Sequence, residues 1–180
     1  MKTRWFNVVA LSFILAGCAS SPEPAWTPTP AQARLVDLTT TRLALAREVA
    51  WVKFRDGLPV LDRQREAESL ARVVALGVEQ GLNAKRIERF FQAQMAASRD
   101  YQSHLISAWN DGGPLPLLPP RNLTQDIRPE IDNLNRQILT QLALAGPKAQ
   151  GPQLASFAQQ HMRQQQIPEP AIRRSSSALR

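Results

Sequence analysis

The chain has 180 residues, of which 43% are hydrophobic, and this length corresponds to one domain of ordinary size. A single Cys and only two His exclude a disulfide framework and any metal site built from several Cys or His ligands. The net charge of +7 is carried mainly by the two ends of the chain, because residues 18–145 hold 15 cations against 14 anions. Binding to nucleic acid needs a concentrated excess of Lys and Arg, so the nearly neutral charge of residues 18–145 excludes such a surface.

The N-terminal segment has the features of a bacterial lipoprotein signal. Two basic residues precede an apolar stretch over residues 5–15, and Ala16 and Gly17 come directly before Cys18. The stretch is about half as long as a membrane-spanning helix, so a permanent span fits less well, and an ordinary signal peptide that contains a cysteine is the other alternative. We therefore expect residues 1–17 to be removed and Cys18 to be lipidated. Ala19 after the cysteine is typical of lipoproteins of the outer membrane, on its periplasmic side.

The next segments predict a tether followed by an all-α domain. Residues 18–30 are rich in Ser and Pro and are expected to be extended. Residues 31–145 have helical periodicity throughout, with no run of alternating β-branched residues. The predicted helices cover residues 31–56, 62–81 (with Asp62 as N-cap), 83–109 and 124–145, with an extended crossover at 111–120.

Two finer expectations concern the second helix and the C-terminus. The buried stripe of the second helix is expected to consist of Leu70, Val73, Val74 and Val78. Residues 146–180 are expected to lie outside the helical domain, as a short Gln-rich helix and a basic tail that is disordered because it is rich in Arg and Ser.

Six polar residues interrupt the apolar faces of the first three predicted helices. Arg42 and Lys53 are cations eleven residues apart, which is almost three turns, so they lie along one line of the first predicted helix. Each residue alone is typical of a side chain that reaches solvent or a local partner. Together they predict an internal cavity lined by cations with few counter-anions, suited to a small ligand with several negative charges. The residues are Arg42, Lys53, Asp62, Arg65, Ser98 and Gln102.

The segments around these positions closely resemble the AroQ class of chorismate mutases, over about residues 33–142. A further segment, Ile131-Asp132-Asn133-Leu134-Asn135 with Arg128 before it, resembles the exported gamma subclass of that family. The segments that carry the class resemblance are residues 35–43, Val52-Lys53-Phe54-Arg55, Leu58-Pro59-Val60 and Asp62-Arg63-Gln64-Arg65-Glu66.

The resemblance implies that the protein binds chorismate, a dianion, in one site per chain of a homodimer. Arg42 and Arg128 would hold ligand carboxylates, with Arg128 supplied by the same chain. Arg65 would pair with a carboxylate and brace the ring, and Ser98 would contact a carboxylate.

The resemblance also implies how the reaction, conversion to prephenate, is accelerated. Lys53 and Gln102 would donate hydrogen bonds to the ether oxygen of the breaking C–O bond, and Asp62 would contact the ring hydroxyl. The rearrangement is unimolecular and needs no nucleophile, metal or redox cofactor, so no cofactor is expected. Its acceleration rests on holding the reactive conformer and stabilising negative charge on the ether oxygen.

Two other functions stay open at this point. An isochorismate pyruvate-lyase would use a similar fold and similar cations, although the exported architecture favours the mutase. A non-catalytic, partner-binding envelope lipoprotein would use the inward polar residues only for structure. The joint presence of Arg42, Lys53, Arg65 and Gln102 argues against that last alternative, because desolvated cations oppose folding.

Overall fold

A computed structural model describes residues 26–180, and this part of the chain is all-α, as predicted. The expected signal peptide, Cys18 and most of the tether lie outside the described residues. Within the described range, no helix has the length and hydropathy that crossing a membrane requires. The helices are α1 (Pro30–Ala44), α2 (Ala46–Arg55), α3 (Arg63–Glu79), α4 (Ala84–Asn110), the π-helical turn η1 (Leu123–Ile127), α5 (Arg128–Ala145), the 3-10 turn η2 (Gly146–Ala149), α6 (Pro152–Gln164) and α7 (Glu169–Ser177).

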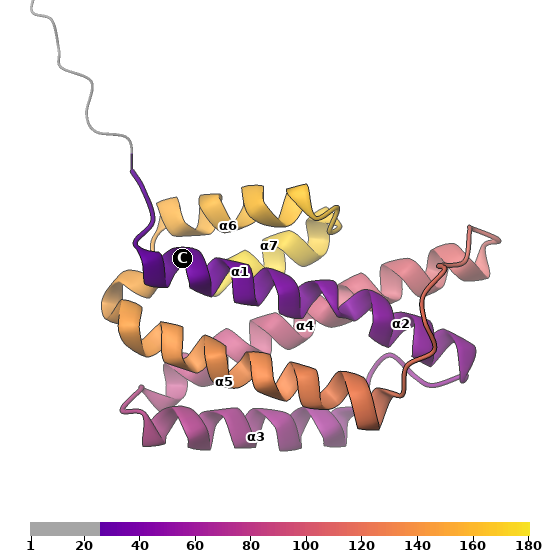
Figure 1. Cartoon of the computed structure of the whole chain (residues 1–180), viewed down its shortest axis with the longest axis horizontal. Helices are drawn as coiled ribbons and strands as arrows, with labels where there is room; N and C mark the ends of the chain where they lie inside the picture. Colours follow the sequence, from indigo (N-terminus) through magenta and orange to yellow (C-terminus); the bar gives the residue numbers. More distant parts are fainter. Residues whose placement is uncertain (1–25) are drawn as a thin grey trace, which may run out of the picture.

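Helices α1 and α2 form a nearly continuous rod (Figure 1). A capping box starts it, in which Thr29 and Gln32 bond each other's backbone N–H groups. The backbone hydrogen bonds continue across the break at Leu45, from its N–H to Thr41 O (3.2 Å) and from Val49 N–H to Leu45 O (3.0 Å). The rod corresponds to the helix predicted over residues 31–56 and carries Arg42 and Lys53.

Helices α3 and α4 are each capped by the side chain of the residue that precedes the helix. Asp62 Oδ1 accepts a hydrogen bond from Arg65 N (3.1 Å), and Asn83 Oδ1 accepts one from Arg86 N (3.0 Å). Asp62 is therefore the N-cap of α3, as predicted. The cap also fixes the side chain of Asp62 where α3 begins.

The predicted buried stripe of α3 is wrong at Val78, which is 50% exposed. The buried face consists instead of Ser69, Val73 and Gly77. A Cβ atom at Gly77 would lie 2.3 Å from Ile87 Cδ1, so the absent side chain lets α3 approach α4 closely. Hydrophobic periodicity gives no weight to a serine and a glycine, and for this reason it rotates the predicted face toward Val78.

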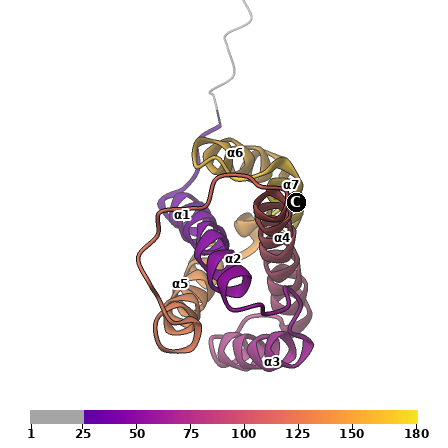
Figure 2. The same cartoon turned by 90° about the vertical axis from the view of Figure 1, so that its right-hand side faces the viewer.

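The helices pack in layers around one core. Helices α1 and α5 lie side by side, and α4 packs against α2, α3 and α7 (Figures 1 and 2). The extended segment after α4 crosses the end of the bundle to reach η1 and α5 (Figure 2). Fully buried side chains at the centre include Leu35, Leu43, Phe91, Ile138 and Leu139.

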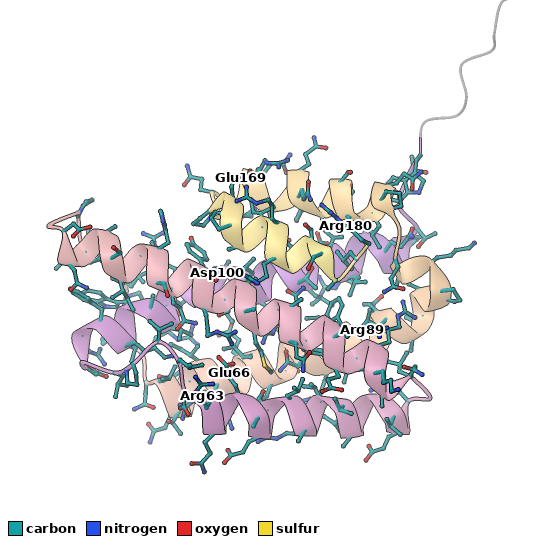
Figure 3. All side chains as sticks on the ribbon, turned by 180° about the vertical axis from the view of Figure 1, so that it is seen from behind. Arg63, Glu66, Arg89, Asp100, Glu169 and Arg180 are labelled. Carbon is teal, nitrogen blue, oxygen red and sulfur yellow. The ribbon has the colours of Figure 1, made fainter. Side chains whose placement is uncertain are left out.

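The C-terminal region differs from the prediction. Residues 169–177 form α7 rather than a disordered tail, and α6 and α7 share the core of the domain, so the predicted domain boundary at residue 145 is also wrong. The predicted Gln-rich helix is present as α6. The ion pair between Arg174 and Asp100 joins α7 to α4, whose faces lie together in Figure 3. The buried residues of this segment have helical spacing, but two of them are serines, so hydrophobicity alone does not reveal the pattern. They are Ala171, Ile172, Ser175, Ser176 and Leu179.

A buried polar contact connects α7 to α4. Gln94 and Ser175 are both fully buried. Ser175 Oγ donates to Gln94 Oε1 (2.9 Å), and Gln94 Nε2 donates to Ser175 O (3.0 Å). Both ends of the Gln94 amide are therefore satisfied by α7, as a buried amide requires.

We expect Ser175→Ala to lower the free energy of unfolding by about 1–3 kcal/mol, because it leaves Gln94 Oε1 buried without its donor. Urea unfolding of the variant and the wild type measures the difference. Ser177→Ala is the matched control, since Ser177 is exposed and bonds only within α7. Equal effects of the two substitutions would show that the contact with Gln94 does not stabilise the domain.

Candidate active site

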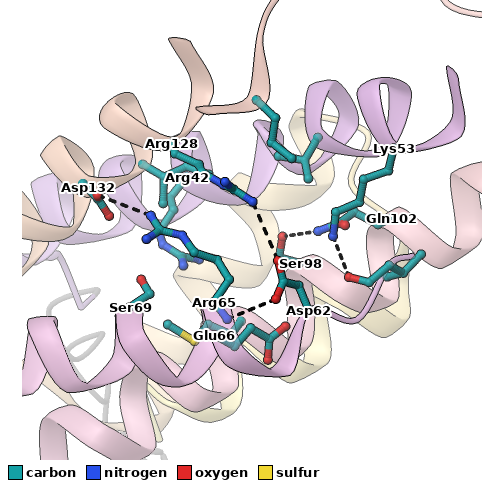
Figure 4. A pocket seen from close by; sticks show the side chains of 15 residues that line it. Arg42, Lys53, Asp62, Arg65, Glu66, Ser69, Ser98, Gln102, Arg128 and Asp132 are labelled. Carbon is teal, nitrogen blue, oxygen red and sulfur yellow. Dashed lines mark hydrogen bonds and ion pairs between the residues drawn. The ribbon is translucent and has the colours of Figure 1, made fainter. Parts of the chain in front are cut away.

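A cavity that is open to solvent lies between the α1–α2 rod and helices α3, α4 and α5 (Figure 4). The structure brings all the polar residues singled out in the sequence to this one cavity, although they come from distant parts of the chain. They are Arg42, Lys53, Asp62, Arg65, Ser98, Gln102 and Arg128.

Arg42 is held by neutral acceptors. Its side chain emerges from α1, and the residue is only 6% exposed. Its Nε donates to Asn135 Oδ1 (2.8 Å), and its Nη1 donates to the main-chain oxygen of Gln94 (3.4 Å). Burial lowers the pKa of Arg42 to about 10, against the raising effect of Asp132 and Glu66, so the guanidinium is still cationic at neutral pH.

Lys53 is the second buried cation. It lies on α2 and is 9% exposed. Its Nζ donates to Val60 O (2.6 Å), in the connection that leads from α2 to α3. Burial lowers the pKa of Lys53, and the carboxylates of Asp62 and Glu66 oppose that shift. Among residues 26–180, the hydrogen-bond partner of this ammonium group is a neutral carbonyl, while the nearby carboxylates favour its charged form.

Arg65 and Arg128 are instead placed near carboxylates. Arg65 Nη2 lies 3.6 Å from Asp132 Oδ2, and Arg128 Nη2 lies 3.7 Å from Asp62 Oδ2 (Figure 4). Both separations exceed ordinary hydrogen-bond distances. Arg128 is the first residue of α5, and the proline that follows it lies in the first turn, where the missing N–H of a proline costs no helical hydrogen bond. Arg128 Nη1 also donates to Thr124 Oγ1 (3.0 Å). The long contacts with Asp132 and Asp62 leave both guanidinium groups able to exchange a carboxylate of the protein for one of a ligand.

Gln102 and Ser98 lie one turn apart on α4. Gln102 Nε2 donates to Ser98 Oγ (2.9 Å), and Gln102 Oε1 is buried without a hydrogen-bond partner among the described residues. Exchanging the amide oxygen and nitrogen would let Ser98 Oγ donate to Oε1 and would turn the NH₂ group toward the former position of the oxygen. In that orientation Gln102 offers a free donor to a ligand.

The expectation of few counter-anions is wrong, because Asp62, Glu66 and Asp132 all line the cavity. Glu66 also forms an ion pair with Arg99. Glu66 and Asp132 were not predicted from the sequence, although their spacing places them on the same helix faces as predicted residues. Glu66 follows Asp62 by one helical turn, and Asp132 follows Arg128 by one turn. Other lining residues that went unpredicted are Val49, Val60, Ser69, Met95, Leu123 and Ile131.

The cavity combines four cations with three carboxylates and an apolar wall. Its net charge favours an anionic ligand, and the fixed positions of its cations favour one whose negative groups are separated. In the part of the chain that the structure describes, no three His, Cys, Asp or Glu side chains are grouped as a metal site would be. The polar groups of the lining provide hydrogen-bond donors and positive charge.

Comparison with protein families gives a match to the model of chorismate mutase type II over residues 32–103. The chain is 28% identical over 136 residues to a secreted chorismate mutase of Yersinia pestis, covering 76% of this chain and 68% of that protein. It is 32% identical over 111 residues to a secreted chorismate mutase of Mycobacterium tuberculosis, covering 61% of this chain and 55% of that one.

Solved structures give the same result. The crystal structure of chorismate mutase from Burkholderia phymatum superimposes with a TM-score of 0.75 and 29% identity, over 83% of this chain and 95% of that one. That of the secreted chorismate mutase from Yersinia pestis gives a TM-score of 0.71 and 26% identity, over 81% of this chain and 94% of that one. The solved structures thus match more than four-fifths of this chain, a larger part than the segment that the family model matches.

Proposed function

The chain belongs to the AroQ-type chorismate mutases, which convert chorismate into prephenate, and from this premise we propose that the cavity described above is the active site. The observation that carries the proposal is that seven side chains, chosen from the sequence for this chemistry, line a single cavity although they come from five helices and one N-cap. Each chain supplies all seven, so the proposed site is complete without residues of a second chain. The homodimer stays a prediction.

In the proposed complex, three arginines bind the two carboxylates of chorismate. Arg42 and Arg128 hold one carboxylate each, and Arg65 pairs with a carboxylate and braces the ring, while Ser98 donates to a carboxylate. The distances of 3.6 and 3.7 Å from Arg65 to Asp132 and from Arg128 to Asp62 support this exchange of partners. Fixing both carboxylates selects the folded conformer from which the new C–C bond can form.

Lys53 and Gln102 donate hydrogen bonds to the ether oxygen, while Asp62 accepts a hydrogen bond from the ring hydroxyl. As the C–O bond breaks, negative charge develops on that oxygen, and a buried ammonium group with an amide donor stabilises it more than it stabilises the substrate. The burial of Lys53 supports this assignment, and so does the NH₂ group of Gln102, which carries two N–H bonds and donates one of them to Ser98 Oγ. The bonds break and form within one molecule, so no group of the protein is consumed.

Product identification tests the proposal against a related reaction. The protein is incubated separately with chorismate and with isochorismate, and the products are separated and identified. We expect prephenate from chorismate. Formation of salicylate and pyruvate from isochorismate, with no prephenate from chorismate, would assign the cavity to an isochorismate pyruvate-lyase instead.

A further part of the proposal concerns location. Two relatives of the chain are secreted chorismate mutases, which supports export of this protein as well. We propose that export is followed by lipidation of Cys18 and anchoring to the periplasmic side of the outer membrane. Residues 1–18 of the sequence, with their basic start, apolar stretch and small residues before the cysteine, support this assignment.

Gln102→Glu is expected to make the reaction depend on acidic pH. A carboxyl group donates to the ether oxygen only while it is protonated, and its ordinary pKa of about 4.3 would be raised by burial and lowered by the neighbouring Lys53. The wild-type amide donates at every pH, so its kcat should stay flat from mildly acidic to neutral pH. The variant should lose kcat over the same range. Overlapping profiles of kcat against pH would mean that Gln102 does not face the reacting oxygen.

Cys18→Ser is expected to prevent lipidation and release the protein from membranes. Fractionation of cells that express each form, with mass spectrometry of the mature N-terminus, measures both effects. Replacing the exposed Lys148 and Arg180 with Ala is the control, because a lipid-anchored protein should stay on the membrane without these charges. Wild-type protein recovered in the soluble periplasmic fraction without acyl chains would contradict the anchor.

A further inference from the structure

Asn135 lies directly behind Arg42, outside the lining of the cavity. It is on α5 and only 1% exposed, and its Oδ1 accepts the hydrogen bond from Arg42 Nε at 2.8 Å. The main-chain oxygen of Gln94 is the second acceptor, for Nη1. Among the described residues, Nη2 makes no hydrogen bond within the protein and is left for a ligand.

The chemical type of these acceptors sets Arg42 apart from two other arginines of the cavity. Arg65 and Arg128 each lie near a carboxylate, which offsets part of their charge. Among residues 26–180, no carboxylate lies within ion-pairing distance of Arg42, so an amide and a carbonyl orient the guanidinium without neutralising it. A carboxylate at position 135 would fit the same space and would bind the guanidinium more strongly.

We propose that Asn135 is a positioning residue that keeps Arg42 directed into the cavity with its charge available to a carboxylate of the substrate. The inference rests on the proposed role of Arg42. It names a residue that does not touch the ligand, and it explains why that residue is a neutral amide.

The stability of the folded protein does not explain why residue 135 is an asparagine. Its Nδ2 is buried and has no hydrogen-bond partner among the described residues, and an unpaired buried donor opposes folding. An aspartate would have no such donor and would form a buried ion pair with Arg42. The amide of Asn135 therefore lowers the stability of the core, but it leaves the charge of Arg42 available in the cavity.

The test compares Asn135→Asp with Asn133→Asp. The first keeps the shape of the side chain and places a negative charge on Arg42, while the second adds the same charge on the exposed side of α5. For Asn135→Asp we expect KM for chorismate to rise at least tenfold, with a smaller change in kcat and a melting temperature that is unchanged or higher. For Asn133→Asp we expect KM within twofold of the wild type. A merely structural role would leave KM unchanged whenever the fold is kept.

Two results would overturn the inference: a KM within twofold of the wild type in folded Asn135→Asp, or an equal rise in Asn133→Asp. If Asn135→Asp does not fold, Asn135→Ala decides, since loss of the acceptor should raise KM several-fold and an unchanged KM would contradict the role. Failure of the proposed function is distinguishable, because the wild type would then form no prephenate from chorismate.

Discussion

The burial of positive charge inside a small helical bundle is the constraint on which the rest of this structure depends. Arg42 and Lys53 are both at least nine-tenths buried, and burial lowers the pKa of each. Placing an ion in a protein interior is costly unless hydrogen bonds replace its water. Here those hydrogen bonds end on neutral oxygens, of Asn135, Gln94 and Val60. The cations are thus held in place by groups that do not neutralise their charge.

This arrangement connects the outer helices to the proposed active site. Gln94 accepts from Arg42 through its main chain, while its side chain is bound by Ser175 of α7. The α7 helix thus supports the segment of α4 that lies behind Arg42. The connection between α2 and α3 acts similarly at Lys53, because its Val60 carbonyl receives the ammonium group. Acceptors on α4, on α5 and in the α2–α3 connection therefore orient the two buried cations.

The sequence was most informative where helical periodicity relates residues to one another. The spacing of Arg42 and Lys53, and of Ser98 and Gln102, places each pair on one helix face, and the family resemblance added Arg128. The sequence was least informative where packing depends on small or polar residues. Ser175 and Ser176 of α7 are buried, although their composition indicated disorder, and Gly77 rather than Val78 faces the core from α3. Contacts between helices, such as Arg65 with Asp132, have no signal in a single sequence.

The kinetics of Lys53→Ala test the central claim most directly, because a fixed positive charge at the ether oxygen matters mainly when the C–O bond breaks. We expect kcat for chorismate to fall about 10²–10³-fold, with a much smaller rise in KM. Lys85→Ala is the matched control, since Lys85 is exposed at the start of α4, far from the lining of the cavity. A folded Lys53→Ala protein with kcat/KM close to that of the wild type would contradict the account.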